Sequence, residues 1–232
     1  MSVFAIADLH LGFGDGVDKP MDAFEGPWVG HEEKLKERWG RLVEENDTVI
    51  IPGDLSWGLH LDQALADLAW LDKLPGTKVL IRGNHDLWWS SMAKMRGLFP
   101  SIRFIQNDCY VGEDFAVFGS RGWLIPGSQD FREEEDGKIY RRELARLQLS
   151  ADSLKEVYGK TIIGAMHFPP SNAELAATGF TDIFAQAGAK TVVFGHLHGF
   201  GGFAKAPNGI IDGVEYKLCS LDKLDCAPLK IL

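Results

Sequence analysis

The chain has 232 residues, 45% hydrophobic and 25% charged, which suits one α/β domain spanning residues 1–232. Its net charge of −9, without a basic cluster, argues against a nucleic-acid partner. The sequence contains no run of about 18 apolar residues, so no membrane span is predicted. The three cysteines form no C-x-x-C pair and the first residues do not resemble a signal peptide, so we expect a cytoplasmic protein.

In the first half of the chain, short apolar runs alternate with amphipathic patterns of helical spacing. Strands are predicted at Val3–Ala7, Thr48–Ile51 and Lys78–Ile81, and helices at His31–Glu45, Leu61–Leu74 and Trp88–Phe99. Strands that alternate with helices in this way indicate βαβ units and a parallel sheet.

In the second half of the chain, the regular alternation of strands and helices is interrupted. Three short runs, 102–105, 109–112 and 115–118, are separated by tight turns and predict an antiparallel meander. The acidic run Glu133–Asp136 is expected to be a solvated loop before a helix over Lys138–Tyr158. Buried strands follow at Thr161–Met166 and Thr191–Phe194, and a second meander is predicted between Phe203 and Cys219.

Residue types that bind metals stand where the apolar strands end. Five strands stop at such residues: Asp8-x-His10, Gly53-Asp54, Gly83-Asn84-His85-Asp86, His167, and Gly195-His196-Leu197-His198-Gly199. The carboxyl ends of parallel strands share one edge of a sheet, so these side chains are expected to converge. The other two histidines, His31 and His60, are expected on the surface of helices.

The converging set is chemically consistent with a metal centre. Carboxylate, imidazole and amide oxygen ligands suit Mn, Fe or Zn, and no cysteine is among them. Seven candidate ligands are too many for one tetrahedral ion: Asp8, His10, Asp54, Asn84, His167, His196 and His198. They indicate two metal ions that share a bridging carboxylate. The alternative, a scatter of structural polar groups, would leave costly unpaired carboxylates in the interior.

The five motifs occur in one order over positions 8 to 198 and resemble those of the calcineurin-like metallophosphoesterase superfamily. The resemblance implies an α/β fold in which two mixed sheets pack as a sandwich flanked by helices. It also implies that Asp8, His10 and His198 bind one metal, that Asn84, His167 and His196 bind the other, and that Asp54 bridges both. His85 would act on the leaving oxygen as general acid or transition-state donor, oriented by Asp86.

Departures from related patterns narrow the subfamily. Trp57 stands where purple acid phosphatases carry a tyrosine ligand, and an indole cannot bind a metal. Protein Ser/Thr phosphatases have an Asp-Arg-Gly segment and a glutamate where this chain has Leu55-Ser56-Trp57-Gly58 and Asp86. Lipid A precursor hydrolases place arginine at the position of His85. The chain is therefore most similar to bacterial-type phosphohydrolases of the superfamily.

Aromatic residues and one arginine follow several of the motifs. Asn84, Arg121, Trp57, Trp88 and Trp123 are candidate substrate contacts, with the tryptophans as an aromatic wall and Arg121 as an anion clamp. Ordinary core packing for the tryptophans and a surface position for Arg121 are equally compatible with the sequence. The loops 11–30 and 121–137 are candidate lids, or simply mobile segments.

The expected reaction is direct hydrolysis of a phosphate ester by a metal-activated water. A small phosphodiester or nucleotide is the favoured substrate, with a phosphomonoesterase or a nuclease of the same superfamily as alternatives. A non-catalytic interaction scaffold on this fold is the alternative from another class.

Overall fold

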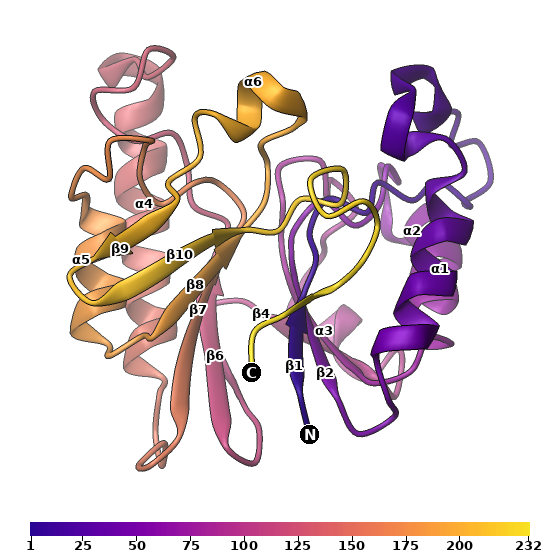
Figure 1. Ribbon diagram of the computed structural model, residues 1–232, viewed down its shortest axis with the longest axis horizontal. Coiled ribbons are helices and arrows are strands. Elements are labelled where there is room, and N and C mark those ends of the chain that lie inside the picture. The colour runs from indigo at the N-terminus through magenta and orange to yellow at the C-terminus, as the bar shows by residue number, and fades with distance from the viewer.

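The computed structural model describes all 232 residues, and two β-sheets face each other at its centre (Figure 1). The first sheet has the order β11-β1-β2-β3-β4. Its strands are β1 (Val3–Ala5), β2 (Thr48–Pro52), β3 (Thr77–Ile81), β4 (Ile102–Ile105) and β11 (Leu229–Lys230). All neighbours pair in parallel except β11, which runs antiparallel to β1.

The second sheet has the order β5-β6-β7-β8-β10-β9. Its strands are β5 (Cys109–Val111), β6 (Phe115–Ser120), β7 (Thr161–Met166), β8 (Thr191–Phe194), β9 (Gly209–Ile211) and β10 (Val214–Leu218). The four central strands are parallel, and antiparallel β5 and β9 form the two edges. Both sheets are therefore mixed, as predicted.

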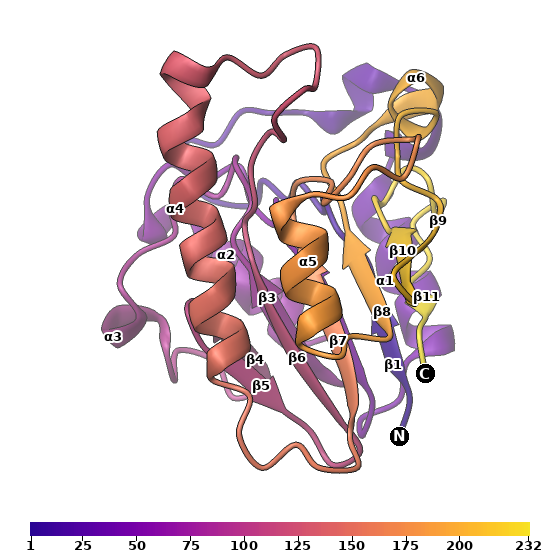
Figure 2. The ribbon, with the colours of Figure 1, turned by 90° about the vertical axis from the view of Figure 1, so that its left-hand side faces the viewer.

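Helices cover the outer face of each sheet (Figures 1 and 2). The first sheet is covered by α1 (His31–Leu42) and α2 (Leu61–Asp72), and the second by α4 (Glu133–Asp152) and α5 (Gly179–Gln186). Short elements complete the fold: η1 (Met21–Phe24), η2 (Gly26–Trp28), α3 (Met92–Met95) and α6 (Gly199–Phe203). None of these helices is both long and apolar enough to cross a membrane.

Three apolar layers hold the four-layer sandwich together. On β2, Val49 and Ile51 face the layer beneath α1 and α2, whereas Ile50 faces the layer between the sheets. Every residue of β2 is buried, as expected for a parallel strand covered on both faces. The third layer lies between the second sheet and its helices, where Phe180 and Phe184 of α5 are buried. The predicted two-sheet sandwich is thus confirmed.

Several local predictions were wrong. The three runs from 102 to 118 do not form one meander, because β4 joins the first sheet parallel to β3 and only β5 and β6 form a hairpin in the second. The predicted helix Trp88–Phe99 shrinks to α3, since both tryptophans pack into the core from a loop. The acidic run 133–136 is the first turn of α4 rather than a loop, a favourable place for negative charge at a helix N-terminus.

The tail and one histidine also differ from expectation. The meander predicted between Phe203 and Cys219 is a β9–β10 hairpin, and β10 pairs in parallel with β8 on its other side. His31 is buried at the start of α1, with Nε2 3.0 Å from the carbonyl oxygen of Leu9, while His60 is exposed.

The close approach of β6 to β7 depends on Gly119. A Cβ atom at this position would lie 1.8 Å from the carbonyl oxygen of Ala165 and 2.7 Å from Cδ1 of Ile81. We expect Gly119→Ala to lower the free energy of unfolding by about 1–3 kcal/mol through overpacking, measured by urea denaturation. Gly40→Ala in α1 is the control, because that Cβ meets nothing within 4 Å and should stabilise the helix by about 0.5–1 kcal/mol. An unchanged urea midpoint for Gly119→Ala would contradict the close approach.

Candidate metal centre

The segments that follow β1, β2, β3, β7 and β8 meet at one edge of the two facing sheets, the upper edge in Figure 1. Backbone hydrogen bonds join them directly. The N–H of Asp8 donates to Gly53, that of His10 donates to Asp54, and that of Gly195 donates to His167. Candidate ligands far apart in the sequence are thereby held in one place.

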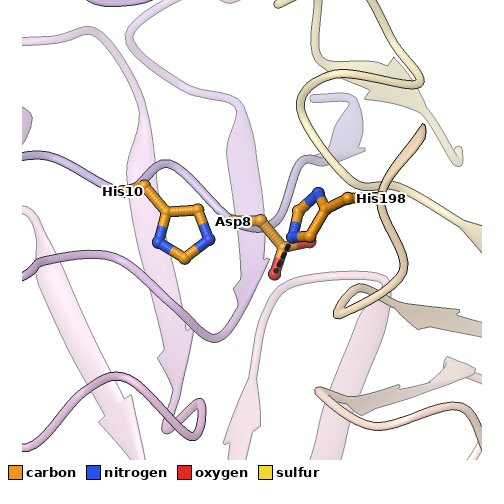
Figure 3. A group of neighbouring side chains, drawn as sticks. All are labelled: Asp8, His10 and His198. Atoms are coloured by element: carbon orange, nitrogen blue, oxygen red, sulfur yellow. Dashed lines mark ion pairs between the residues drawn. The ribbon is translucent and has the colours of Figure 1, made fainter. Parts of the chain in front are cut away.

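The first group of candidate ligands is Asp8, His10 and His198. One ligand atom from each lies within 4.8 Å of the others. Figure 3 shows the carboxylate of Asp8 beside the ring of His198, with His10 on the other side of Asp8, and Oδ1 of Asp8 lies 3.9 Å from Nε2 of His198. The backbone N–H of His196 donates to both oxygens of Asp8, at 3.1 and 3.0 Å, and so fixes the orientation of this carboxylate.

The second group is Asn84, His167 and His196. The side-chain oxygen of Asn84 lies 2.7 Å from Nε2 of His167 and 2.9 Å from Nδ1 of His196. These two nitrogens are 3.3 Å apart. Three atoms that could bind a metal, from three different motifs, thus point at one another.

Asp54 lies between the two groups. Its Oδ2 is 4.0 Å from Nε2 of His10 and 3.3 Å from Nε2 of His167, while its Oδ1 accepts the backbone N–H of His85 at 2.8 Å. This is the position that a bridging ligand requires. Asp8 also approaches the second group, because its Oδ1 is 3.7 Å from Nδ1 of His167. The assignment of individual ligands to each metal stays a prediction.

The electrostatics of the cluster suit cations. Burial lowers the pKa of His10 and of His196 to about 3, so both imidazoles are neutral at pH 7 and have a lone pair to offer. Burial alone would also lower the pKa of His167, but the carboxylates of Asp54 and Asp8 outweigh it and raise that pKa to about 9. A place that stabilises a proton on a buried ring also favours a metal ion.

The ring of His10 presents Nε2 to the cluster, 4.0 Å from Oδ2 of Asp54, and its other nitrogen points away from Asp8 (Figure 3). Nδ1 of this ring is buried and has no hydrogen-bond partner in the protein. Together, imidazole, carboxylate and amide oxygen donors make a set suited to Mn, Fe or Zn.

Two candidate ligands are oriented by groups behind them. Nδ1 of His167 lies 3.0 Å from the carbonyl oxygen of Pro52, which can only accept, so this nitrogen carries a proton and Nε2 faces the cluster. Nδ1 of His198 lies 3.0 Å from Oδ1 of Asp222, and Oδ2 of the same carboxylate accepts the N–H of Gly199 at 2.9 Å. Carboxylate–histidine pairs of this kind orient metal ligands in many proteins.

Asp222 was missed from the sequence. It stands in an irregular tail after β10, where no apolar strand precedes it and no motif marks it. The tail is tied to the site by the pairing of Ser220 with Ala7 and by the N–H of Leu221, which donates to Ala7.

The backbone of the site is strained at four candidate ligands. Their φ angles lie in the left-handed region that residues other than glycine rarely adopt: 61° at Asp8, 46° at His10, 54° at Asp54 and 73° at His196. Each such residue costs of the order of 1–2 kcal/mol. Strain of this kind concentrates at functional sites.

The role expected for Asp86 is wrong. Its buried carboxylate makes no hydrogen bond to the ring of His85 and instead accepts from five other donors. These are the backbone N–H groups of Gly83, Asp54, Leu55 and Ser56, at 2.7, 2.9, 2.9 and 3.3 Å, and the indole N–H of Trp88 at 2.9 Å. Asp86 therefore binds the second motif to the third. The nearest rings to His85 are those of Trp57 and His10, with centroids 4.5 and 5.7 Å away.

A cavity of about 220 Å³, here called the central cavity, opens over the candidate ligands. His85, exposed to solvent, lines it together with His10, Asp54, Trp57, Met21 and Trp28. Trp57 stacks on His10 with ring centroids 4.6 Å apart and an angle of 19° between the planes. Trp28, from the loop 11–30, lies 5.8 Å from His10 and 5.5 Å from His198. This loop covers the site, and the sequence did not single out Trp28 as a contact.

A second cavity of about 460 Å³, the lateral cavity, adjoins the first through His196, which lines both. Trp123, from the loop 121–137, forms part of its wall with Phe168, and Leu197 also lines it. The ring of Phe168 lies 4.1 Å from that of His196 and 5.0 Å from that of Trp123. The indole N–H of Trp123 donates to Asp136 at 2.9 Å.

Two expected substrate contacts are placed elsewhere. Trp88 is buried in the core with its N–H on Asp86, so it is not part of a wall around the metals. Arg121 lines neither the central nor the lateral cavity, and its guanidinium pairs with buried Glu143 at 3.4 Å. The sequence placed both residues near the site because they follow motifs in the chain. The side chain of Trp88 turns into the core instead, and the guanidinium of Arg121 packs on the ring of Trp123, 4.6 Å from its centroid, without lining either cavity.

Comparison with known families agrees with this geometry. The model of the family described as calcineurin-like phosphoesterase matches residues 1–200. The chain belongs to the calcineurin-like phosphoesterase family. This is a family of metal-dependent phosphoester hydrolases, generally with a dinuclear metal centre, so the predicted enzyme class is confirmed at the level of the family.

Two similar phage proteins match only part of this calcineurin-like chain. The Gene 66 protein of Mycobacterium phage D29 is 38% identical over 87 residues, which are 37% of this chain and 40% of the phage protein. Its counterpart in phage L5 is 45% identical over 56 residues, 24% of this chain and 27% of that protein. The matched segments thus span less than half of either relative.

Two solved structures share the fold. The phosphopantetheinyl hydrolase PptH of Mycobacterium tuberculosis aligns with a TM-score of 0.56 and 13% identity, covering 100% of this chain and 95% of its own. A protein of unknown function from Aquifex aeolicus, AQ665, aligns with a TM-score of 0.51 and 14% identity, covering 99% and 95%. At these identities the likeness concerns the fold alone.

The contacts of Asp86 predict that Asp86→Asn damages the fold as well as the site. An amide can accept through only one of its two atoms, so several backbone N–H groups would lose an acceptor. We expect a loss of about 3 kcal/mol or more in the free energy of unfolding, measured by urea denaturation, with loss of bound metal. If Asp86 merely oriented His85, the variant would instead keep its stability and lose only turnover.

The contacts of Asp222 predict a weaker metal site. Asp222→Ala should lower metal affinity by about 10–100-fold, because His198 loses the acceptor that orients it. The measurement is titration of chelator-treated protein with Mn²⁺ by calorimetry. The control is Asp225→Ala, which removes an exposed carboxylate that pairs with Arg38 at 2.7 Å. Equal affinities for the two variants would show that Asp222 does not support the site.

Proposed function

We propose that this chain hydrolyses small phosphodiesters, nucleotide-like ones included, at a centre of two metal ions. Asp8, His10 and His198 would hold one ion, Asn84, His167 and His196 the other, and Asp54 both. When bound, the ions would supply a nucleophile at neutral pH and offset the negative charge of the phosphate. In this reaction the oxygen of water bonds to phosphorus, the bond from phosphorus to one ester oxygen breaks, and that oxygen takes up a proton.

The observation that carries the preference for a diester is the pair of cavities that meet at His196. A phosphodiester has an organic group on each side of its phosphate, and a phosphate at the ligand cluster would have one cavity on either side. Both cavities have aromatic walls, Trp28 and Trp57 in one and Trp123 and Phe168 in the other. Flat rings of this kind suit a base or an apolar leaving group. A monoester would use only one of the two.

The side chain of His85 supports a role at the leaving oxygen. It lines the central cavity beside Asp54 and has no hydrogen-bond partner of its own in the protein. Although the ring is exposed on one side, its partial removal from water lowers its pKa from the usual value. This favours the neutral ring at pH 7, which can donate one N–H to an oxygen of the ester. With Asp86 engaged elsewhere, Trp57 is the group that packs against this ring.

The proposal is tested with bis-p-nitrophenyl phosphate and p-nitrophenyl phosphate on chelator-treated protein reloaded with Mn²⁺. We expect turnover of the diester to return with metal and to fall about 100-fold or more in Asp54→Asn and in His85→Ala. Metal content, measured alongside, should fall in the first variant and stay unchanged in the second, which separates a ligand from a group that acts on the ester.

Trp123→Leu tests the lateral cavity. Removing this wall should raise KM for the diester several-fold and leave KM for the monoester unchanged, because a monoester has no second organic group. Turnover of the monoester alone would overturn the preference for diesters while leaving phosphoester hydrolysis in place. If neither substrate turned over with any metal, the alternative of a non-catalytic scaffold would be favoured.

A further inference from the structure

A third cavity, here called the arginine cavity, lies at the same edge of the sandwich but shares no lining residue with the central or the lateral cavity. It has a volume of about 180 Å³ and lies where β3, β4 and β6 end beneath α4. Arg82, Arg121 and Arg146 line it, with Glu143 as the only acidic residue. In a chain with a net charge of −9, this concentration of guanidinium groups is unusual.

The three arginines are not neutralised by the protein. Oε1 of the buried Glu143 lies 2.8 Å from Arg146 and 3.4 Å from Arg121, so one carboxylate serves two of these cations. Arg82, the third, makes no ion pair and no side-chain hydrogen bond, and its Nε is buried without a partner. Nε of Arg121 is likewise buried and unpartnered. Oε2 of Glu143 is also buried without a partner, so the cluster holds two unpaired donors and one unpaired acceptor. Unpaired guanidinium donors cost free energy unless a ligand satisfies them.

The walls of the cavity also offer neutral donors. Ser90, Gln106, Asn107 and Ser120 line it between the arginines. Guanidinium forks match the geometry of carboxylate and phosphate oxygens, and amide and hydroxyl groups complete such sites. The cavity is smaller than the roughly 300 Å³ at which sites for drug-sized ligands begin, which favours a compact anion or an anionic head group.

We propose that the arginine cavity is a binding site for an oxyanion, a phosphate or carboxylate group, separate from the metal centre. The guanidinium groups of Arg82 and Arg121 grip the oxygens, and Arg146 closes the site from α4. Glu143 holds Arg121 and Arg146 in place and leaves an excess of positive charge for the ligand. This site does not depend on the reaction proposed for the metal centre.

Binding of inorganic phosphate to the Mn²⁺-loaded protein, measured by calorimetry, tests the site. We expect two phosphates per chain, one at the metal centre and one in the arginine cavity. Arg82→Gln and Arg146→Gln should each weaken the second by about tenfold or more, which corresponds to about 1.4 kcal/mol. Asp54→Asn, which disturbs only the metal centre, should keep the phosphate of the arginine cavity.

Arg142→Gln is the matched control, since Arg142 is also on α4 and contacts Glu143 at 3.4 Å but does not line the cavity. It should bind phosphate as the unchanged protein does. A single phosphate per chain, lost in Asp54→Asn and kept in both arginine variants, would overturn the site. Because the readout is binding, failure of the proposed hydrolysis would leave this result interpretable.

Kinetics distinguish two sources of the anion. If the anion is a second charged group of the substrate, Arg82→Gln raises KM only for phosphate esters that carry an additional carboxylate or phosphate. If the anion is a free ion, KM is unchanged for both kinds of ester while phosphate binding is still lost. Either outcome, with the loss of binding, supports the site.

Discussion

The carboxylate of Asp86 is the interaction on which the rest of the site depends. It accepts from the backbone at Gly83 and from three consecutive N–H groups that begin at Asp54, and it thereby ties the segment after β2 to the segment after β3. The position of Asp54 between the two groups of candidate ligands follows from this, because its backbone is fixed by Asp86 and its carboxylate by the N–H of His85. The negative charge is expensive to bury: burial raises the pKa of Asp86 to about 6. Its five hydrogen-bond donors offset that cost. An apolar side chain at this position would remove these hydrogen bonds, and with them the connection between the segments after β2 and β3.

Close packing around the ligands leaves no space for side chains at the glycines that precede them. A Cβ at Gly83 would lie 2.0 Å from Oδ1 of Asp54, and one at Gly195 would lie 2.5 Å from Oδ2 of Asp8. These glycines let two loops approach a carboxylate that belongs to a third. The left-handed backbone at Asp8, His10, Asp54 and His196 has the same origin, because each strand must turn sharply to aim a side chain at a common point. The apolar layers of the sandwich hold the strand ends in register against this strain.

The convergence of ligands could be predicted from the sequence, since it needs only parallel strands that end at Asp8, Asp54, Asn84, His167 and His196. The direction of individual side chains could not. Asp86 is next to His85 in the chain but faces the opposite way, and Trp88 follows it into the core. Asp222 has no periodicity or motif around it and reaches His198 only through the path of the tail. The predicted meander over residues 102–118 was wrong for a related reason. The turn residues between β4 and β5 are the same whether the chain forms a hairpin there or crosses to another sheet.

The central cavity and the arginine cavity differ in the source of their positive charge. An acidic protein repels phosphate esters at long range, and the candidate centre itself contains two buried carboxylates. Cations held by Asp8 and Asp54 would reverse that field locally, which makes attraction of the substrate conditional on metal. The arginine cavity is different, because its positive charge belongs to the chain and is present whether or not metal is bound. The exposed Lys19, whose Nζ lies 5.9 Å from the ring centre of Trp57, adds a further positive charge of the chain near the central cavity. Anion recognition on this fold therefore has a part that depends on metal and a part that does not, and the two respond differently to a chelator.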